Sequence, residues 1–292
     1  MMAEVGVIAM GGDAFGLVTL ALVTCVAAAV NSVAGGGTIL TFPALVAILP
    51  PDPARMVVAN ATSTIGLWPG ALAAAWAYRG ERAGQPPWAR WLVVPSVVGA
   101  IVGSALVLVL PPAWFEAMVP WLILLAAVLF AAQPYLARLS WGQACSLPNS
   151  AGYKPASTSP DSPPDSTSAP SRILLACALQ FLVAVYGGYF GAGIGILMLA
   201  VLGMLGLGDI HKLNAVKNVL GMVVNGAAAG LFAIGALAGA HDVSWTHVGV
   251  MAVASVAGGL GGSHLARRMP PAVVRRIVAI IGFALAGYYF AK

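Results

Sequence analysis

One lysine and three asparagines stand out in the apolar stretch 213–236: Asn214, Lys217, Asn218 and Asn225. A charge at the centre of a membrane-spanning helix costs about 2.5–3.5 kcal/mol on insertion scales, so a lysine in such a stretch points to a function. Asn218 and Asn225 are seven residues apart and share one helical face. A cation beside hydrogen-bonding amides is suited to binding an anion. Two alternatives remain: Lys217 lies near one end and can snorkel to the membrane surface, and asparagines can bond neighbouring helices.

Glycine-rich segments interrupt the two longest apolar runs, 14–49 and 173–205. One crossing needs about 20 residues, so we expect each run to form two helical legs joined at a break. Lipid cannot satisfy the backbone groups freed there, whereas a polar cavity can, and helix N-termini attract anions. The predicted site residues are Asn31, Ser32, Gly35, Gly36, Gly37 and Thr38 in the first run and Gly187, Gly188, Gly191 and Gly193 in the second. Close helix packing by small residues is the alternative.

Enzyme chemistry is not indicated. The three cysteines have no metal-binding spacing, and the apolar runs hold no paired carboxylates or His–Glu set. Ser263 and His264 are adjacent, so on a helix they do not face each other. No ATP-binding motif is present. We therefore expect a protein that is not an enzyme and has no metal or cofactor.

The amino-acid composition indicates that the surface of the protein faces lipid more than water. The chain of 292 residues is 60% hydrophobic and only 8% charged, whereas soluble domains carry roughly 25% charged residues. Most of the surface must therefore face lipid, which excludes a soluble enzyme. Nucleic acid is excluded as a partner because the basic residues form short clusters between apolar runs. Tryptophans such as Trp68 and Trp114 are interpreted as interfacial aromatic residues.

The apolar runs fall into two halves. Residues 145–171 contain eight serines and six prolines, a composition that cannot build a core. We predict a first membrane repeat at 14–133, a linker at 134–172 and a second membrane repeat at 173–290.

The halves match each other in sequence. Gly35 and Gly37 align with Gly191 and Gly193, and Gly103-Ser104 followed by Pro111-Pro112 aligns with Gly262-Ser263 followed by Pro270-Pro271. We infer an internal duplication. Thr62 and Ser63 then fall opposite Asn218 and Val219 and are predicted to supply hydroxyl donors to the site. Alternatively, their hydroxyls bond their own helix backbone.

Basic residues predict the orientation, because cytoplasmic loops collect Lys and Arg. If each glycine-broken run returns to its own side, one side receives eleven basic residues and the other only Arg55 and Lys292, with Lys217 in the membrane. If each broken run crosses once, the split is even. The first arrangement is favoured and makes the halves inverted repeats, with the linker cytoplasmic and both termini outside.

The expected fold is an all-α polytopic membrane protein of about 8–10 membrane segments. Each of its two inverted-topology repeats holds a glycine-broken helical hairpin plus three spanning helices. The first run is preceded by Glu4 and Asp13 and by no basic residue, so we expect a retained segment and not a cleaved leader. Charge does not distinguish two full crossings from a re-entrant hairpin.

Three segments resemble the sulfite exporter TauE/SafE family, also called toluene-sulfonate uptake permeases. They are Asn31-Ser-Val-Ala-Gly-Gly-Gly-Thr-Ile-Leu-Thr-Phe-Pro43, Tyr186-Gly-Gly-Tyr-Phe-Gly-Ala-Gly-Ile-Gly-Ile-Leu197 and Asp209-Ile-His-Lys-Leu-Asn-Ala-Val-Lys-Asn218. The resemblance covers both halves. It implies a cytoplasmic-membrane carrier of sulfur-containing or related organic anions, such as sulfite, sulfonates or sulfoacetate.

The predicted function is secondary transport of small anions, with a lipid bilayer around the chain and a proton or sodium ion as the expected type of coupling ion. Inverted repeats with discontinuous helices recur in such carriers. A passive anion channel, or a carrier of other organic anions, is the alternative. The sequence leaves the anion, the direction and the oligomeric state open.

Overall fold

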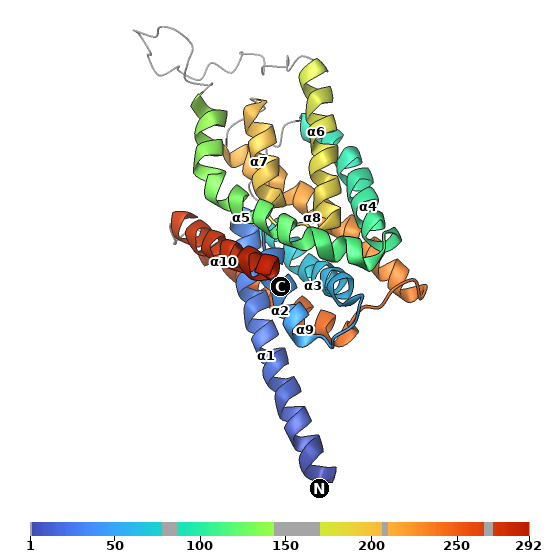
Figure 1. Ribbon diagram of the computed structural model, residues 1–292. Coiled ribbons are helices and arrows are strands. Elements are labelled where there is room, and N and C mark those ends of the chain that lie inside the picture. The colour runs from blue at the N-terminus through green and yellow to red at the C-terminus, as the bar shows by residue number, and fades with distance from the viewer. Residues whose placement is uncertain (1, 78–86, 143–169, 206–209, 266–270, 292) are drawn as a thin grey trace, which may run out of the picture.

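Every secondary-structure element that the structure describes is a helix (Figure 1). The computed structural model describes residues 2–77, 87–142, 170–205, 210–265 and 271–291. These residues form ten α-helices and one 3₁₀ helix, with no strand among them. The all-α expectation is therefore confirmed for this part of the chain.

The first half holds five of the α-helices. They are α1 (Met2–Ala34), α2 (Thr38–Ile48), α3 (Arg55–Ala77), α4 (Val93–Val109) and α5 (Pro112–Gly142), with the 3₁₀ helix η2 (Pro87–Leu92) before α4. The run 14–49 thus contains two helices, with residues 35–37 between them. Helix α5 continues past residue 133 to Gly142, and residues 143–169 of the expected linker lie outside the described residues.

The second half repeats this order of helices. It consists of α6 (Pro170–Tyr189), α7 (Ile194–Met204), α8 (Ile210–Leu237), α9 (Trp245–Leu265) and α10 (Pro271–Ala291). Helix α6 and the short helix α7 together occupy the run 173–205, as α1 and α2 occupy the first long run.

The apolar surface of these helices fits a multi-pass membrane protein. Among the described residues, four segments are long and apolar enough to cross a membrane: Ala14–Ser32, Trp88–Val109, Pro112–Gln133 and Leu213–Leu237. Large apolar side chains are exposed on several helices, including Leu182, Val253 and Phe15. A soluble protein rarely exposes extended apolar patches of this kind.

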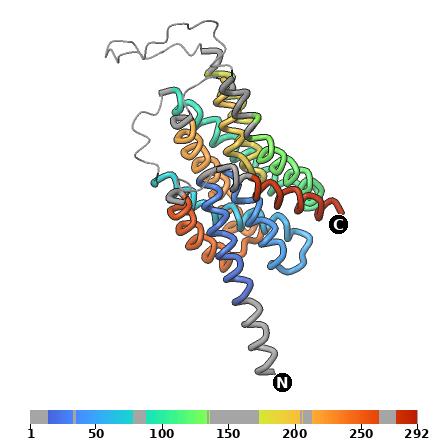
Figure 2. The backbone as a smooth tube through the Cα atoms, turned by 90° about the vertical axis from the view of Figure 1, so that its left-hand side faces the viewer, coloured from blue at the N-terminus to red at the C-terminus, as the bar shows by residue number. Residues whose placement is uncertain are grey.

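The helices form two groups that draw members from both halves. Helix α9 packs against α1 and α3, and α4 packs against α6 and α8. The first group lies at the lower end of the bundle and the second at the upper end in both views (Figures 1 and 2). Helices α3 and α8 join the two groups, and α5 packs beside α10.

Small residues allow the close packing in both groups. On α4, a Cβ atom at Gly99 would lie 2.6 Å from the Phe181 carbonyl oxygen, and one at Gly103 would collide with the Val185 carbonyl oxygen. On α9, a Cβ atom at Gly258 would collide with the Cys25 carbonyl oxygen. Glycines four residues apart let membrane helices approach until their backbones touch. Gly99 and Gly258 are 159 residues apart, as are the aligned Gly103 and Gly262, so the contacts of Gly99 and Gly258 occur at equivalent positions of the two halves.

We predict that alanine at these glycines lowers stability. In G103A or G258A the added methyl group must push two helix backbones apart, which costs about 1–3 kcal/mol. Thermal unfolding in detergent measures this effect. Gly249 of α9 is the matched control, since a Cβ atom there has no neighbour within 4 Å. A midpoint for G103A and G258A equal to that of G249A would contradict the packing argument.

Candidate functional site

The segments that follow α1 and α6 meet inside the bundle. The Gly195 N–H donates a hydrogen bond to the Gly35 carbonyl oxygen over 3.3 Å, which joins the two halves through backbone atoms. A Cβ atom at Gly35 would lie 2.6 Å from the Gly195 Cα, and Gly35 has φ +73°. Both the left-handed conformation and the close approach require glycine at position 35.

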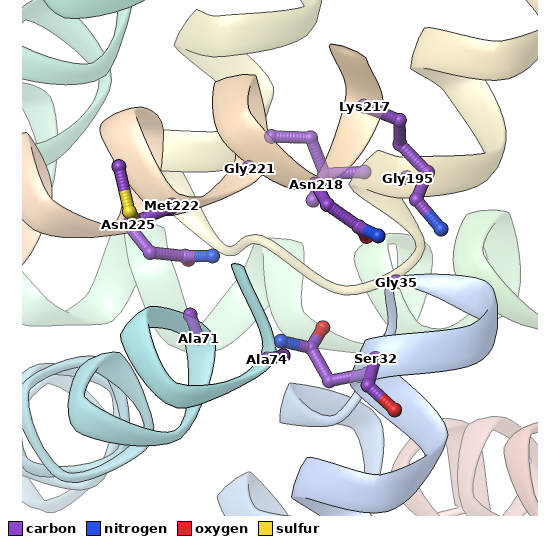
Figure 3. A pocket seen from close by; sticks show the side chains of 12 residues that line it. Ser32, Gly35, Ala71, Ala74, Gly195, Lys217, Asn218, Gly221, Met222 and Asn225 are labelled. Carbon is purple, nitrogen blue, oxygen red and sulfur yellow. The ribbon is translucent and has the colours of Figure 1, made fainter. Parts of the chain in front are cut away.

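A pocket lies where these segments meet α3 and α8 (Figure 3). It encloses about 370 Å³ of empty space, including space open to the solvent. Its polar lining comes from α1 and α8: Asn31, Ser32, Lys217, Asn218 and Asn225. The remaining lining is small or apolar: Gly35, Ala71, Ala74, Ile194, Gly195, Gly221 and Met222.

Lys217 supplies the positive charge of this pocket. Its side chain is only 2% exposed and extends from α8 toward Gly195 (Figure 3). It therefore lies in the pocket and not on the lipid-facing surface. No carboxylate is among the pocket-lining residues. In a low-dielectric site, a lysine in such a lining attracts an anion strongly.

Three amide side chains line the same space, those of Asn31, Asn218 and Asn225. Asn31 Oδ1 accepts a hydrogen bond from the Gly37 N–H at 3.5 Å, which leaves its amide nitrogen to donate elsewhere. The Asn218 side chain points from α8 into the space between α8 and α1 (Figure 3). An arrangement of ammonium and amide donors suits an oxyanion.

Two helix ends also face the pocket, with opposite partial charges. Ile194 and Gly195 form the N-terminal end of α7, where the helix dipole favours an anion. The C-terminal end of α1 has the opposite sign. One of its terminal carbonyl groups is engaged, because Asn31 O accepts the Gly35 N–H at 3.0 Å. One turn earlier, Ala29 O accepts the Ser32 hydroxyl at 2.8 Å.

Thr62 and Ser63 lie outside the pocket lining and bond other elements. Thr62 Oγ1 accepts the Ser244 N–H at 3.2 Å, which ties α3 to the segment before α9. Ser63 Oγ lies 2.6 Å from Thr41 Oγ1 of α2. Neither hydroxyl therefore reaches the pocket in this conformation. Asn214 is also outside the lining, and its buried Oδ1 has no hydrogen-bond partner among the described residues.

The other predicted glycines surround the pocket without lining it. Gly187 and Gly188 lie where helices pack closely, since Cβ atoms there would collide with Ile194 and with the Ala100 carbonyl oxygen. Gly36 lies against the Phe130 ring in the same manner. Gly37 and Gly193 precede α2 and α7 as their N-caps.

Gly191 and Thr38 also lie outside the lining, and Gly191 is beside Asn225, which lines the pocket. A Cβ atom at Gly191 would lie 3.7 Å from Thr38 Oγ1 and 3.9 Å from Asn225 Oδ1. The lack of a side chain at Gly191 therefore leaves space beside the amide of Asn225.

Several lining residues were missed by the sequence prediction. Gly221 and Met222 lie one turn from Lys217 and Asn218 on α8, so helical spacing indicates them. Ala71 and Ala74 have no chemical character to reveal them, and Ile194 and Gly195 follow the predicted glycines directly. Among the described residues there is no cluster of three His, Cys, Asp or Glu that could hold a metal ion.

Comparison with known proteins gives two matches. A curated relative from Haemophilus influenzae, described as a "Probable membrane transporter protein", is 26% identical over 274 residues, which are 92% of this chain and 94% of the relative. No solved structure matches the chain. The model of the sulfite exporter TauE/SafE family matches residues 20–289, a range that includes every residue of the pocket. The chain therefore belongs to the TauE/SafE family of membrane transporters.

Proposed function

We propose that this protein is a secondary transporter of small sulfur-containing anions, such as sulfite, sulfonates or sulfoacetate-like compounds, across the cytoplasmic membrane. The observation that carries the proposal is Lys217, buried in a pocket with three amides and no carboxylate. Family membership supports the class of substrate. The anion binds where the two glycine-rich helix breaks meet.

Alternating access is the proposed mechanism. The two halves are inverted repeats, and the equivalent packing of α1 on α9 and of α6 on α4 supports this relation. The pocket lies at the junction of the group α1–α3–α9 with the group α4–α6–α8. Rocking of one group against the other exposes the pocket to each side in turn, as in other carriers built from inverted repeats.

Uptake into proteoliposomes tests this function. We expect saturable uptake of labelled sulfite or a small sulfonate, driven by an imposed proton or sodium gradient. Carboxylates of similar size are the comparison anions, and protein-free liposomes are the control. Flux that rises linearly with concentration and ignores every gradient would favour the alternative, a passive anion channel. Saturable uptake of carboxylates alone would favour a transporter of other organic anions.

The role of Lys217 is tested by changing its charge. We expect K217M to raise the KM for the anion at least tenfold, because a hydrogen bond to a charged group contributes about 1.5–3 kcal/mol. K217R retains the charge and should bind more tightly than K217M. Arg276, an exposed residue of α10, gives the matched control R276M. If K217M and R276M have the KM of the parent protein, the assignment of the site is wrong.

In the proposed topology, the chain spans the inner (cytoplasmic) membrane, the linker 134–172 is on the cytoplasmic side and both termini are outside. Cys145 is a natural probe once Cys25 and Cys177 are replaced by serine. A membrane-impermeant maleimide should then label Cys145 in inside-out vesicles and not in intact spheroplasts. E4C in a cysteine-free chain should show the reverse pattern. Labelling of both positions from one side would contradict the odd number of crossings in each half.

A further inference from the structure

The half-buried indole of Trp68 lies near the Asn225 end of the pocket, outside the pocket lining. Trp68 lies on α3 one helical turn before Ala71, which lines the pocket. Its Nε1 atom is buried and has no hydrogen-bond partner among the described residues. An indole nitrogen is a donor only, and a buried indole N–H usually has an acceptor. The missing acceptor points to a ligand.

Gly226 fixes the position of this donor. A Cβ atom at Gly226 would lie 2.6 Å from Trp68 Nε1 and 3.2 Å from Trp68 Cε2, so the indole rests directly on the backbone of α8. Because Gly226 follows Asn225 in the chain, the indole nitrogen is held next to the last polar residue of the pocket on α8.

The lining residues give the pocket a direction. Along α8 they run from Lys217 to Asn225, and along α3 from Ala74 to Ala71. Trp68 precedes Ala71 by three residues on α3, and Gly226 follows Asn225 by one residue on α8, about 100° around the helix from it. Gly226 follows Lys217 by nine residues of α-helix, about 13.5 Å along the axis. Lys217 and Gly226 therefore lie at opposite ends of this stretch of α8.

We propose that the Trp68 indole N–H is a second anion-binding position, which the substrate reaches after it leaves Lys217 and passes Asn225. This inference rests on the proposed function. Lys217 and the amides bind the anion on entry, and Trp68 donates to one of its oxygens at the next position. The tryptophan is then a residue of the transport path and not an interfacial anchor.

The test separates the two positions by kinetics. In proteoliposomes with labelled sulfite and a methanesulfonate comparison, we expect W68F to lower the maximal rate about tenfold, the effect of losing a hydrogen bond to an anion. The KM should change less than twofold, because the entry position at Lys217 is intact. K217M should show the opposite pattern, in which the KM rises and the maximal rate changes little.

Two further variants exclude a purely structural effect. A benzothiophene analogue of tryptophan, inserted at position 68 by nonsense suppression, keeps the size of the ring system and replaces the N–H by sulfur. It should reproduce the loss seen in W68F. W114F is the matched control, since Trp114 is 63% exposed on α5. It should transport at the parent rate.

Three results would overturn the proposal: parent-like rates in W68F, parent-like rates in the benzothiophene variant, or equal losses in W68F and W114F. If the parent protein shows no saturable uptake of any anion tested, the proposed function fails and this inference fails with it. Saturable uptake by the parent with a parent-like W68F rejects the role of Trp68 alone.

Discussion

The structure depends on how backbone groups are satisfied where two helices end inside an apolar bundle. Lipid offers no hydrogen bonds to such groups, so the protein must provide them. Here the Gly195 N–H at the start of α7 bonds the Gly35 carbonyl oxygen after α1, and each half completes the other. A side chain at Gly35 would separate these backbones. The pocket lies beside this contact, which joins the segment after α1 to the first turn of α7.

The arrangement of the helices follows from the same need for close approach. Gly103 on α4 and Gly258 on α9 let each helix press against the backbone of a helix from the other half. Since dispersion and close packing, and not the hydrophobic effect, hold helices together in a membrane, such positions determine which helices become neighbours. The two groups of helices they define meet at the pocket, so packing and site have a common origin.

Much of this could be predicted from the sequence, for identifiable reasons. The length of the apolar runs and their glycines indicate the helices and their ends, and helical spacing indicates that Lys217, Asn218 and Asn225 act together. The hydrogen-bond partners of Thr62 and Ser63 could not be predicted from the sequence. These partners, Ser244 and Thr41, lie on other segments, and helix packing determines which segments become neighbours. Ala71 and Ala74 have no chemical group that a sequence could reveal.

For Trp68, the general tendency of tryptophan in membrane proteins differs from the role that we propose. Tryptophan concentrates at membrane interfaces, and that expectation was applied to it. Yet Trp68 stands near the middle of α3, far from either end of the helix Arg55–Ala77. The position of Trp68 in the middle of an apolar run was the sequence feature that argued against an interfacial location. Only the structure could show that the Trp68 Nε1 atom is buried and lies against Gly226, because this contact depends on how α3 faces α8.

The electrostatics of the pocket give the proposed transport cycle a physical basis. Lys217 and the N-terminal end of α7 bring positive charge to the pocket, and the C-terminal end of α1 brings partial negative charge to it. In the proposed cycle, a pocket closed to water on both sides holds the Lys217 ammonium in a medium of low dielectric. An anion that binds there would accept hydrogen bonds from the lysine and the amides and so favour the closed state. Under this proposal, the charge that selects the substrate also couples its binding to movement.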